Sequence, residues 1–126
     1  MDRTFFIIGS ILAGLAVVLG AFGAHGLKNM VAPEMINTWE KAVRYQMYHA
    51  LALLLLAWAI THWPAGANLW NIGGWLFLAG VVLFSGSLYL LVLSGIKWLG
   101  AITPLGGVAF GLGWLCLLIA AWRSGG

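Results

Sequence analysis

The stretch that decides the fold is WEKAVRYQMYHALALLLLAWAI, residues 39–60. Its first half carries Glu40, Lys41 and Arg44, three of only nine charged residues (six basic and three acidic), whereas residues 51–60 carry none. A helix that changes from amphipathic to apolar all round is typical of a segment that starts at a membrane surface and then crosses it. We therefore expect this helix, the second of the chain, to begin as an amphipathic interfacial segment and to span the membrane over residues 46–63.

The composition of the whole chain supports a membrane protein. Of its 126 residues, 63% are hydrophobic and 7% are charged, whereas soluble domains are about one quarter charged. We predict an all-α fold, an integral membrane four-helix bundle that forms a single domain over residues 1–126 and whose main partner is the lipid bilayer. Basic residues do not cluster or alternate with aromatic ones, so we expect no nucleic acid partner.

Three further apolar runs, at residues 4–24, 72–94 and 98–122, bring the number of predicted spans to four. About 20 apolar residues cross a hydrocarbon core of roughly 30 Å, and residues 4–24 exceed the usual length of a signal-peptide core. The last run has two interpretations. A long helix from Trp98 is kinked at Pro104, or a helix starts with Thr103 as N-cap and Pro104 at its first position. We favour the kinked long helix.

Small residues recur at helical spacing within three of the runs, and such strips let helix backbones approach closely where lipid removes the hydrophobic driving force. We predict that these residues pack helices together. They are Gly9, Ala13, Ala16, Gly20, Gly73, Gly80, Gly107 and Gly111.

The polar side chains of the spans define a candidate site. Gln46 falls near the centre of the inward stripe of helix two, where a buried amide needs partners. The helix order brings the others toward the same side of the membrane, the side of residues 26–32 and 95–97. The predicted ligand-binding belt consists of His25, Gln46, His49, Ser85, Ser87, Tyr89 and Thr103. It is either a hydrogen-bonded plug that fixes the register of four helices or a shallow cavity open to that face.

The basic residues indicate the orientation. That face carries Lys28, Lys41, Arg44 and Lys97, against Arg3 and Arg123 on the other. The positive-inside rule then places the belt side in the cytoplasm and both termini in the periplasm. We expect an aromatic belt on the opposite side, formed by Trp58, Trp63, Trp70, Trp75, Trp114 and Trp122.

Little chemistry is available in this sequence. The four predicted spans contain no Asp, Glu, Lys or Arg, and no nucleophile–base–acid set appears. His25 and His49 offer two metal ligands, while His62 and Cys116 lie toward the opposite face, so we predict no metal site. A haem between His25 and His49 is geometrically conceivable, and we rank it last. We expect no catalytic residues, no cofactor and no enzymatic activity.

Four ordered blocks resemble one known family. They are GAFGAHGL at residues 20–27, YQMYHALAL at 45–53, FSGSLY at 84–89 and TPLGG at 103–107. The chain is similar over nearly its whole length to the small four-helix inner-membrane family typified by the bacterial YgdD protein, which has eukaryotic TMEM-type relatives. The resemblance implies four membrane spans and brings no activity, because the function of that family is unknown.

We therefore expect a multi-pass protein of the bacterial inner membrane without enzymatic activity. It acts as an assembly or accessory component that packs against itself, as a homo-oligomer, or against a larger membrane complex. The alternative is an oligomeric small transporter or channel that binds a small polar or lipid-like substrate in the polar belt.

Overall fold

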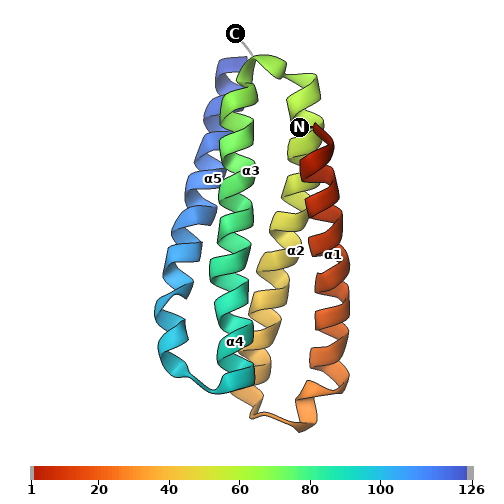
Figure 1. The fold of residues 1–126 in the computed structure, drawn as a ribbon, viewed down its shortest axis with the longest axis vertical. Coiled ribbons are helices and arrows are strands. Elements are labelled where there is room, and N and C mark those ends of the chain that lie inside the picture. The colour runs from red at the N-terminus through yellow and green to blue at the C-terminus, as the bar shows by residue number, and fades with distance from the viewer. Residues whose placement is uncertain (1, 125–126) are drawn as a thin grey trace.

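The computed structural model describes residues 2–124, which form four long helical rods, each antiparallel to the one before it in the chain (Figure 1). All four are long and apolar enough to cross a membrane, which confirms the prediction of an all-α membrane bundle. The third rod is an α-helix, a π-helical segment and a second α-helix in series. The elements are α1 (Asp2–His25), α2 (Pro33–His62), α3 (Ala67–Gly80), the π-helix η3 (Val81–Gly86), α4 (Ser87–Ser94) and α5 (Thr103–Ser124), with 3₁₀ turns η1 (Leu27–Asn29), η2 (Pro64–Gly66) and η4 (Lys97–Ala101).

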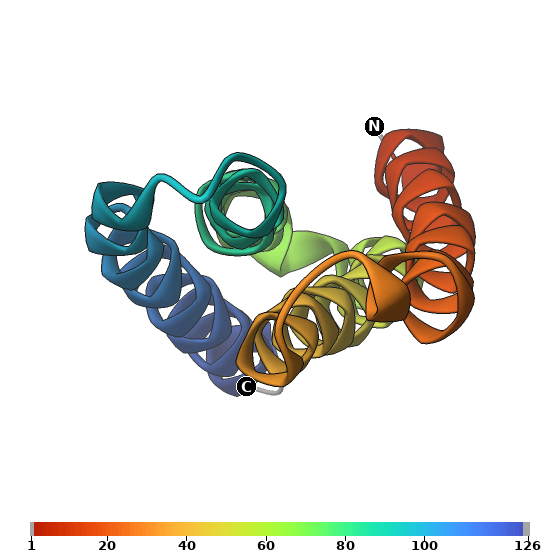
Figure 2. The same cartoon turned by 90° about the horizontal axis from the view of Figure 1, so that it is seen from below.

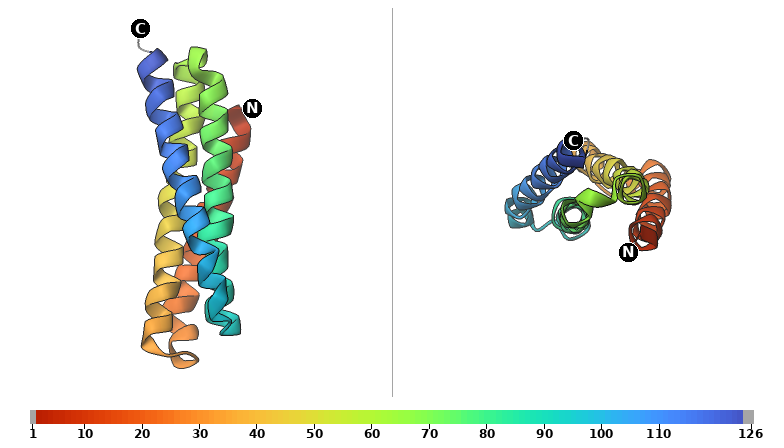
Figure 3. Two further views of the ribbon diagram at one scale, coloured as in Figure 1. Left: turned by 90° about the vertical axis from the view of Figure 1, so that its left-hand side faces the viewer. Right: turned by 90° about the horizontal axis from the view of Figure 1, so that it is seen from above.

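The rods pack mainly as two pairs. α1 contacts α2 along most of its length, α3 packs chiefly on α5, and α2 joins the two pairs through contacts with α3, η3 and α4. The view along the bundle shows α1 and α5 on opposite sides, with α2 and the third rod between them (Figure 2). Both termini lie near the end that holds η2, here called the upper end, and the connections 26–32 and 95–102 form the lower end (Figures 1 and 3).

The helix boundaries follow from local sequence. Pro33 begins α2, where its missing N–H costs no helical hydrogen bond. Gly95 ends α4 with φ +74°, a left-handed conformation that glycine adopts without a Cβ clash, and its N–H donates to the Leu91 carbonyl over 2.8 Å. These two helix boundaries allow the chain to turn sharply at the lower end.

The start of α5 differs from our expectation. Residues 97–101 form a 3₁₀ turn, and the α-helix begins at Thr103 with Pro104 in its first turn. The favoured long helix kinked at Pro104 is therefore wrong, and the second interpretation gives the start of the helix correctly, with Thr103 as its first helical residue rather than its N-cap. At this position the ring of Pro104 displaces no helical hydrogen bond, since the first N–H groups of a helix have no partner inside it.

The register between α1 and α2 is set by close contacts. Trp39 Nε1 donates to the Leu19 carbonyl over 2.8 Å, and a Cβ added to Gly9 would lie 2.8 Å from the Ala50 carbonyl oxygen. The amphipathic first half of α2 is thus continuous with the rest of the helix, and it runs beside α1 rather than apart from the bundle.

The predicted packing residues divide into two groups. Gly9, Gly73 and Gly80 lie at close contacts inside the chain, where an added Cβ would meet a neighbour at 2.8, 2.5 and 2.3 Å. Ala16 is buried, Ala13 is half-buried, and a Cβ on Gly20 would make ordinary contact with Val43 at 3.4 Å. By contrast, a Cβ on Gly107 or Gly111 would meet nothing within 4 Å.

The face of α5 that packs on the third rod carries different glycines. A Cβ on Gly106 would lie 2.4 Å from the Phe84 backbone nitrogen, and one on Gly113 would lie 2.6 Å from the Phe77 ring. The strip of Gly107 and Gly111 therefore faces away from this contact.

Candidate functional site

Gln46 connects three rods. Its side chain is buried, its Nε2 donates to the Leu12 carbonyl of α1 over 2.8 Å, and its Oε1 accepts from the Tyr89 hydroxyl of α4 over 2.7 Å. The stripe of apolar residues on α2 turns the amide inward, as the sequence predicted. Both ends of the amide are bonded, so burial leaves neither the donor nor the acceptor without a partner.

His49, one turn after Tyr45, is the second buried polar group of α2. Its Nδ1 lies 2.8 Å from the Tyr45 carbonyl oxygen, and its Nε2 lies 3.0 Å from Trp114 Nε1 on α5. A carbonyl only accepts and an indole N–H only donates, so these partners assign a neutral ring with its proton on Nδ1. The ring also stacks on Phe110, with centroids 3.6 Å apart and planes within 8°.

Two serines and a threonine connect the third rod to its neighbours. The fully buried Ser85 hydroxyl donates to the Ala42 carbonyl of α2 over 2.7 Å. Ser87 lies 2.6 Å from the Thr103 hydroxyl at the start of α5 and donates to the Phe84 carbonyl over 3.0 Å. Ser85 lies in the π-helix η3, a local widening of the helix that frequently marks functional or strained positions.

The structure brings six of the seven predicted belt residues into these interhelical contacts. The seventh, His25, is exposed at the last residue of α1, at the lower end, and does not join them. The partners of Gln46 and His49 lie near the midpoints of α1 and α5. The network thus extends from the middle of the bundle toward the lower end.

Trp114 departs from the aromatic belt expected at the upper end. It occupies the middle of α5, where its N–H bonds to His49, so its assignment to the belt was wrong. The sequence contained a signal for this contact, because a tryptophan in mid-span needs an acceptor for its N–H. The tilted contact of Tyr45 with Phe84 and the stacking of His49 on Phe110 had no comparable signal.

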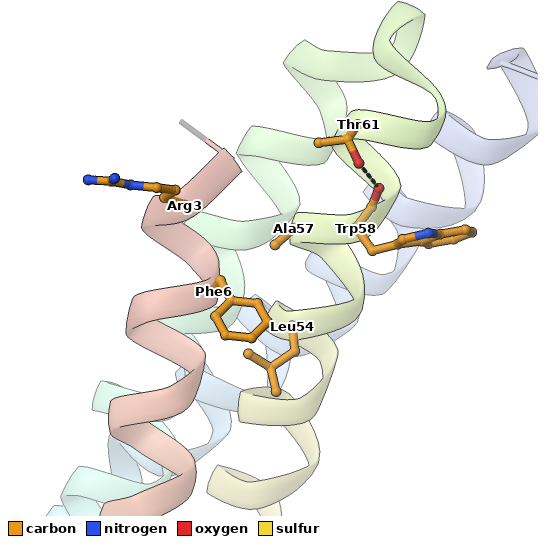
Figure 4. A pocket seen from close by; sticks show the side chains of 6 residues that line it. All are labelled: Arg3, Phe6, Leu54, Ala57, Trp58 and Thr61. Carbon is orange, nitrogen blue, oxygen red and sulfur yellow. Dashed lines mark hydrogen bonds between the residues drawn. The ribbon is translucent and has the colours of Figure 1, made fainter.

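A surface hollow of about 340 Å³ between α1 and α2 at the upper end carries little convergent polar chemistry. Figure 4 shows its apolar side chains Phe6 and Leu54 together, while the Arg3 guanidinium points away and the Thr61 hydroxyl bonds to the Trp58 carbonyl. Across residues 2–124, no group of three or more His, Cys, Asp or Glu side chains is placed to hold a metal ion.

Fold and site together define a multi-pass α-helical membrane protein whose polar core is hydrogen-bonded across its helices. Residues 19–107 match the family model described as "Protein of unknown function (DUF423)", and the chain belongs to this family. It is 48% identical over 124 residues to a UPF0382 membrane protein of Staphylococcus aureus (strain bovine RF122 / ET3-1), covering 98% of this chain and 99% of that one. It is 49% identical over 119 residues to the UPF0382 membrane protein YwdK of Bacillus subtilis (strain 168), covering 94% and 96%.

No solved structure matches the chain. The four sequence blocks predicted a family of membrane proteins without an established function, and this prediction is confirmed.

Proposed function

We propose that this protein is a non-enzymatic assembly or accessory component of the bacterial inner membrane. The observation that carries the proposal is that central side chains of the polar belt are already hydrogen-bonded within the chain. Both polar ends of Gln46 and both ring nitrogens of His49 have hydrogen-bond partners within the chain. Groups used in this way fix the register of the helices and are not available to a substrate unless the packing opens.

The outer face of α5 offers a surface for a partner helix. Gly107 and Gly111 are four residues apart, and the space beside each of them is open. Small residues at this spacing let a second helix approach closely in a membrane. The partner is a second copy of this chain or a subunit of a larger complex. In the membrane, the lower end of the bundle faces the cytoplasm and both termini lie in the periplasm.

The proposal is tested by placing bulk on that face. The double substitution Gly107→Leu and Gly111→Leu adds side chains where the fold has room, so the chain keeps its structure while assembly is lost. Gly14→Leu is the matched control, because Gly14 of α1 also has open space around it. Native mass in mild detergent reports the result. Unchanged assembly in the double variant contradicts the use of this face.

An oligomeric small transporter or channel is the second candidate. The observation in its favour is a mainly apolar hollow of about 450 Å³ between α4 and η4, with Ser87 and Tyr89 in its lining. Such a hollow suits a lipid-like substrate better than a polar one. An uptake or lipid-flipping assay in vesicles separates the two candidates. A transporter shows an activity that Tyr89→Phe lowers without changing the native mass, whereas an accessory component shows no such activity.

A further inference from the structure

Glu40 of α2 lies further along the bundle, relative to α1, than its position in the sequence suggests. The Trp39 indole contacts the carbonyl of Leu19, which is five residues, or about 8 Å at 1.5 Å per residue, inside the end of the apolar run 4–24. That run has the length of the hydrocarbon core. Glu40 follows Trp39, so its backbone lies at a depth where α1 is apolar.

A carboxylate at this depth needs a cation or a polar cavity. Glu40 is exposed and forms no ion pair within residues 2–124. Arg44, four residues further along the same helix, is at the right spacing for a pair, yet the two side chains do not meet within that range.

Glu40 lines a hollow of about 460 Å³ between the end of α1 and the start of α2. Lys28 from η1 and the Asn37 amide from α2 line it too, together with apolar side chains that include Ile36. Lys28 likewise makes no ion pair within the described residues. The hollow therefore presents a carboxylate and an ammonium that are unpaired within residues 2–124, near the lower end of the bundle.

We propose that this hollow binds the headgroup of a phospholipid that carries both an amine and a phosphate. Glu40 accepts hydrogen bonds from the lipid ammonium, and Lys28 pairs with the phosphate. The occupant follows from charge complementarity, because a zwitterionic headgroup neutralises both side chains, and the exposed apolar flank of α1, which includes Val17 and Val18, offers a surface for its acyl chains. The inference is independent of the proposed assembly role.

The test is lipid binding to the purified full chain, measured by native mass spectrometry. Phosphatidylethanolamine is compared with phosphatidylcholine, whose quaternary ammonium donates no N–H hydrogen bond, and with phosphatidylglycerol, which has no amine. We expect about a tenfold preference for phosphatidylethanolamine over phosphatidylcholine, the size of one charge-assisted hydrogen bond.

Variants that remove one charge at a time assign the preference to this hollow. Glu40→Gln abolishes the preference for phosphatidylethanolamine, and Lys28→Gln weakens the binding of all three lipids. Glu34→Gln is the matched control, since Glu34 is an exposed carboxylate on the same helix outside the hollow. Size-exclusion profiles establish that each variant is folded.

Three results would overturn the proposal. The first is equal binding of phosphatidylethanolamine and phosphatidylcholine to the unmodified chain, and the second is an unchanged preference in Glu40→Gln. The third is a preference that disappears in Glu34→Gln as it does in Glu40→Gln, which would place lipid selection on general surface charge. A change of native mass in Glu40→Gln with no change in lipid preference would instead assign Glu40 to a contact between chains.

Discussion

The indole N–H of Trp114 donates a hydrogen bond to Nε2 of His49 over 3.0 Å and connects α5 to α2 near the middle of the bundle. The backbones of these two helices have few close contacts, so side chains hold them together. The His49 ring also stacks on Phe110 of the same α5 helix, which makes this contact both polar and aromatic.

A double-mutant cycle on Trp114→Phe and His49→Phe measures this bond. Both changes keep an aromatic ring, so stacking is retained while the hydrogen bond is removed. We expect a coupling energy of about 0.6 kcal/mol and at most about 1.7 kcal/mol, the range found for hydrogen bonds between membrane helices. Reversible unfolding in mixed micelles gives the four stabilities, and strictly additive effects would show that the bond contributes nothing.

Gln46→Leu removes two interhelical hydrogen bonds and leaves the Tyr89 hydroxyl without its acceptor. We expect a loss of about 1–3 kcal/mol in the free energy of unfolding, since the half-buried Tyr89 hydroxyl loses its partner. Ser94→Ala is the control, because the Ser94 hydroxyl bonds locally, to the Leu90 carbonyl and the Ile96 N–H of its own exposed turn. Equal stability of the two variants would argue against a structural role for Gln46.

Gly106 and Gly107 offer a matched pair on α5. A methyl group on Gly106 would lie 2.4 Å from the backbone nitrogen of Phe84, so Gly106→Ala forces the third rod away and costs about 1–3 kcal/mol. Gly107→Ala meets open space and gains helix propensity of up to about 1 kcal/mol. Thermal unfolding in detergent distinguishes them, and a less stable Gly107→Ala would contradict the assigned face of α5.

The orientation of the bundle is tested by cysteine labelling in whole cells. In a Cys116→Ala background, Asn29→Cys marks the lower end and Ala65→Cys marks the upper end. The basic residues Lys28, Lys41, Arg44 and Lys97 favour a cytoplasmic lower end. A membrane-impermeant maleimide should therefore label position 65 and not position 29, and the reverse pattern would refute the orientation.

Much of the architecture could be predicted from sequence because its signals are local. Apolar runs of membrane length predicted the four rods, and the helical wheel of α2 predicted that Gln46 faces inward. Pro104 had two locally acceptable positions, one as a kink and one in a first turn. The choice depended on the 3₁₀ turn of residues 97–101, for which we identified no signal in the sequence.

The partners of the polar side chains were not predictable in the same way, since they depend on how the rods rotate against each other. Ser85 was predicted to belong to the polar belt, but its partner was not predicted; it lies in the π-helix η3 and donates to the Ala42 carbonyl of α2. Likewise, the close contact with Phe84 is made by Gly106 and not by the neighbouring Gly107, which was the predicted packing residue. Sequence spacing identifies a strip of small residues, and only packing tells which strip contacts a neighbour within the chain.

The measurement that tests the central proposal most directly is the native mass of the unmodified protein extracted from its own membrane in a mild detergent, with every co-purifying chain identified. An accessory role predicts a defined assembly of several chains, with copies of this protein or stoichiometric foreign subunits, which dissociates in the Gly107→Leu and Gly111→Leu variant. A monomer with no partner, in the unmodified protein as in the variant, would contradict it.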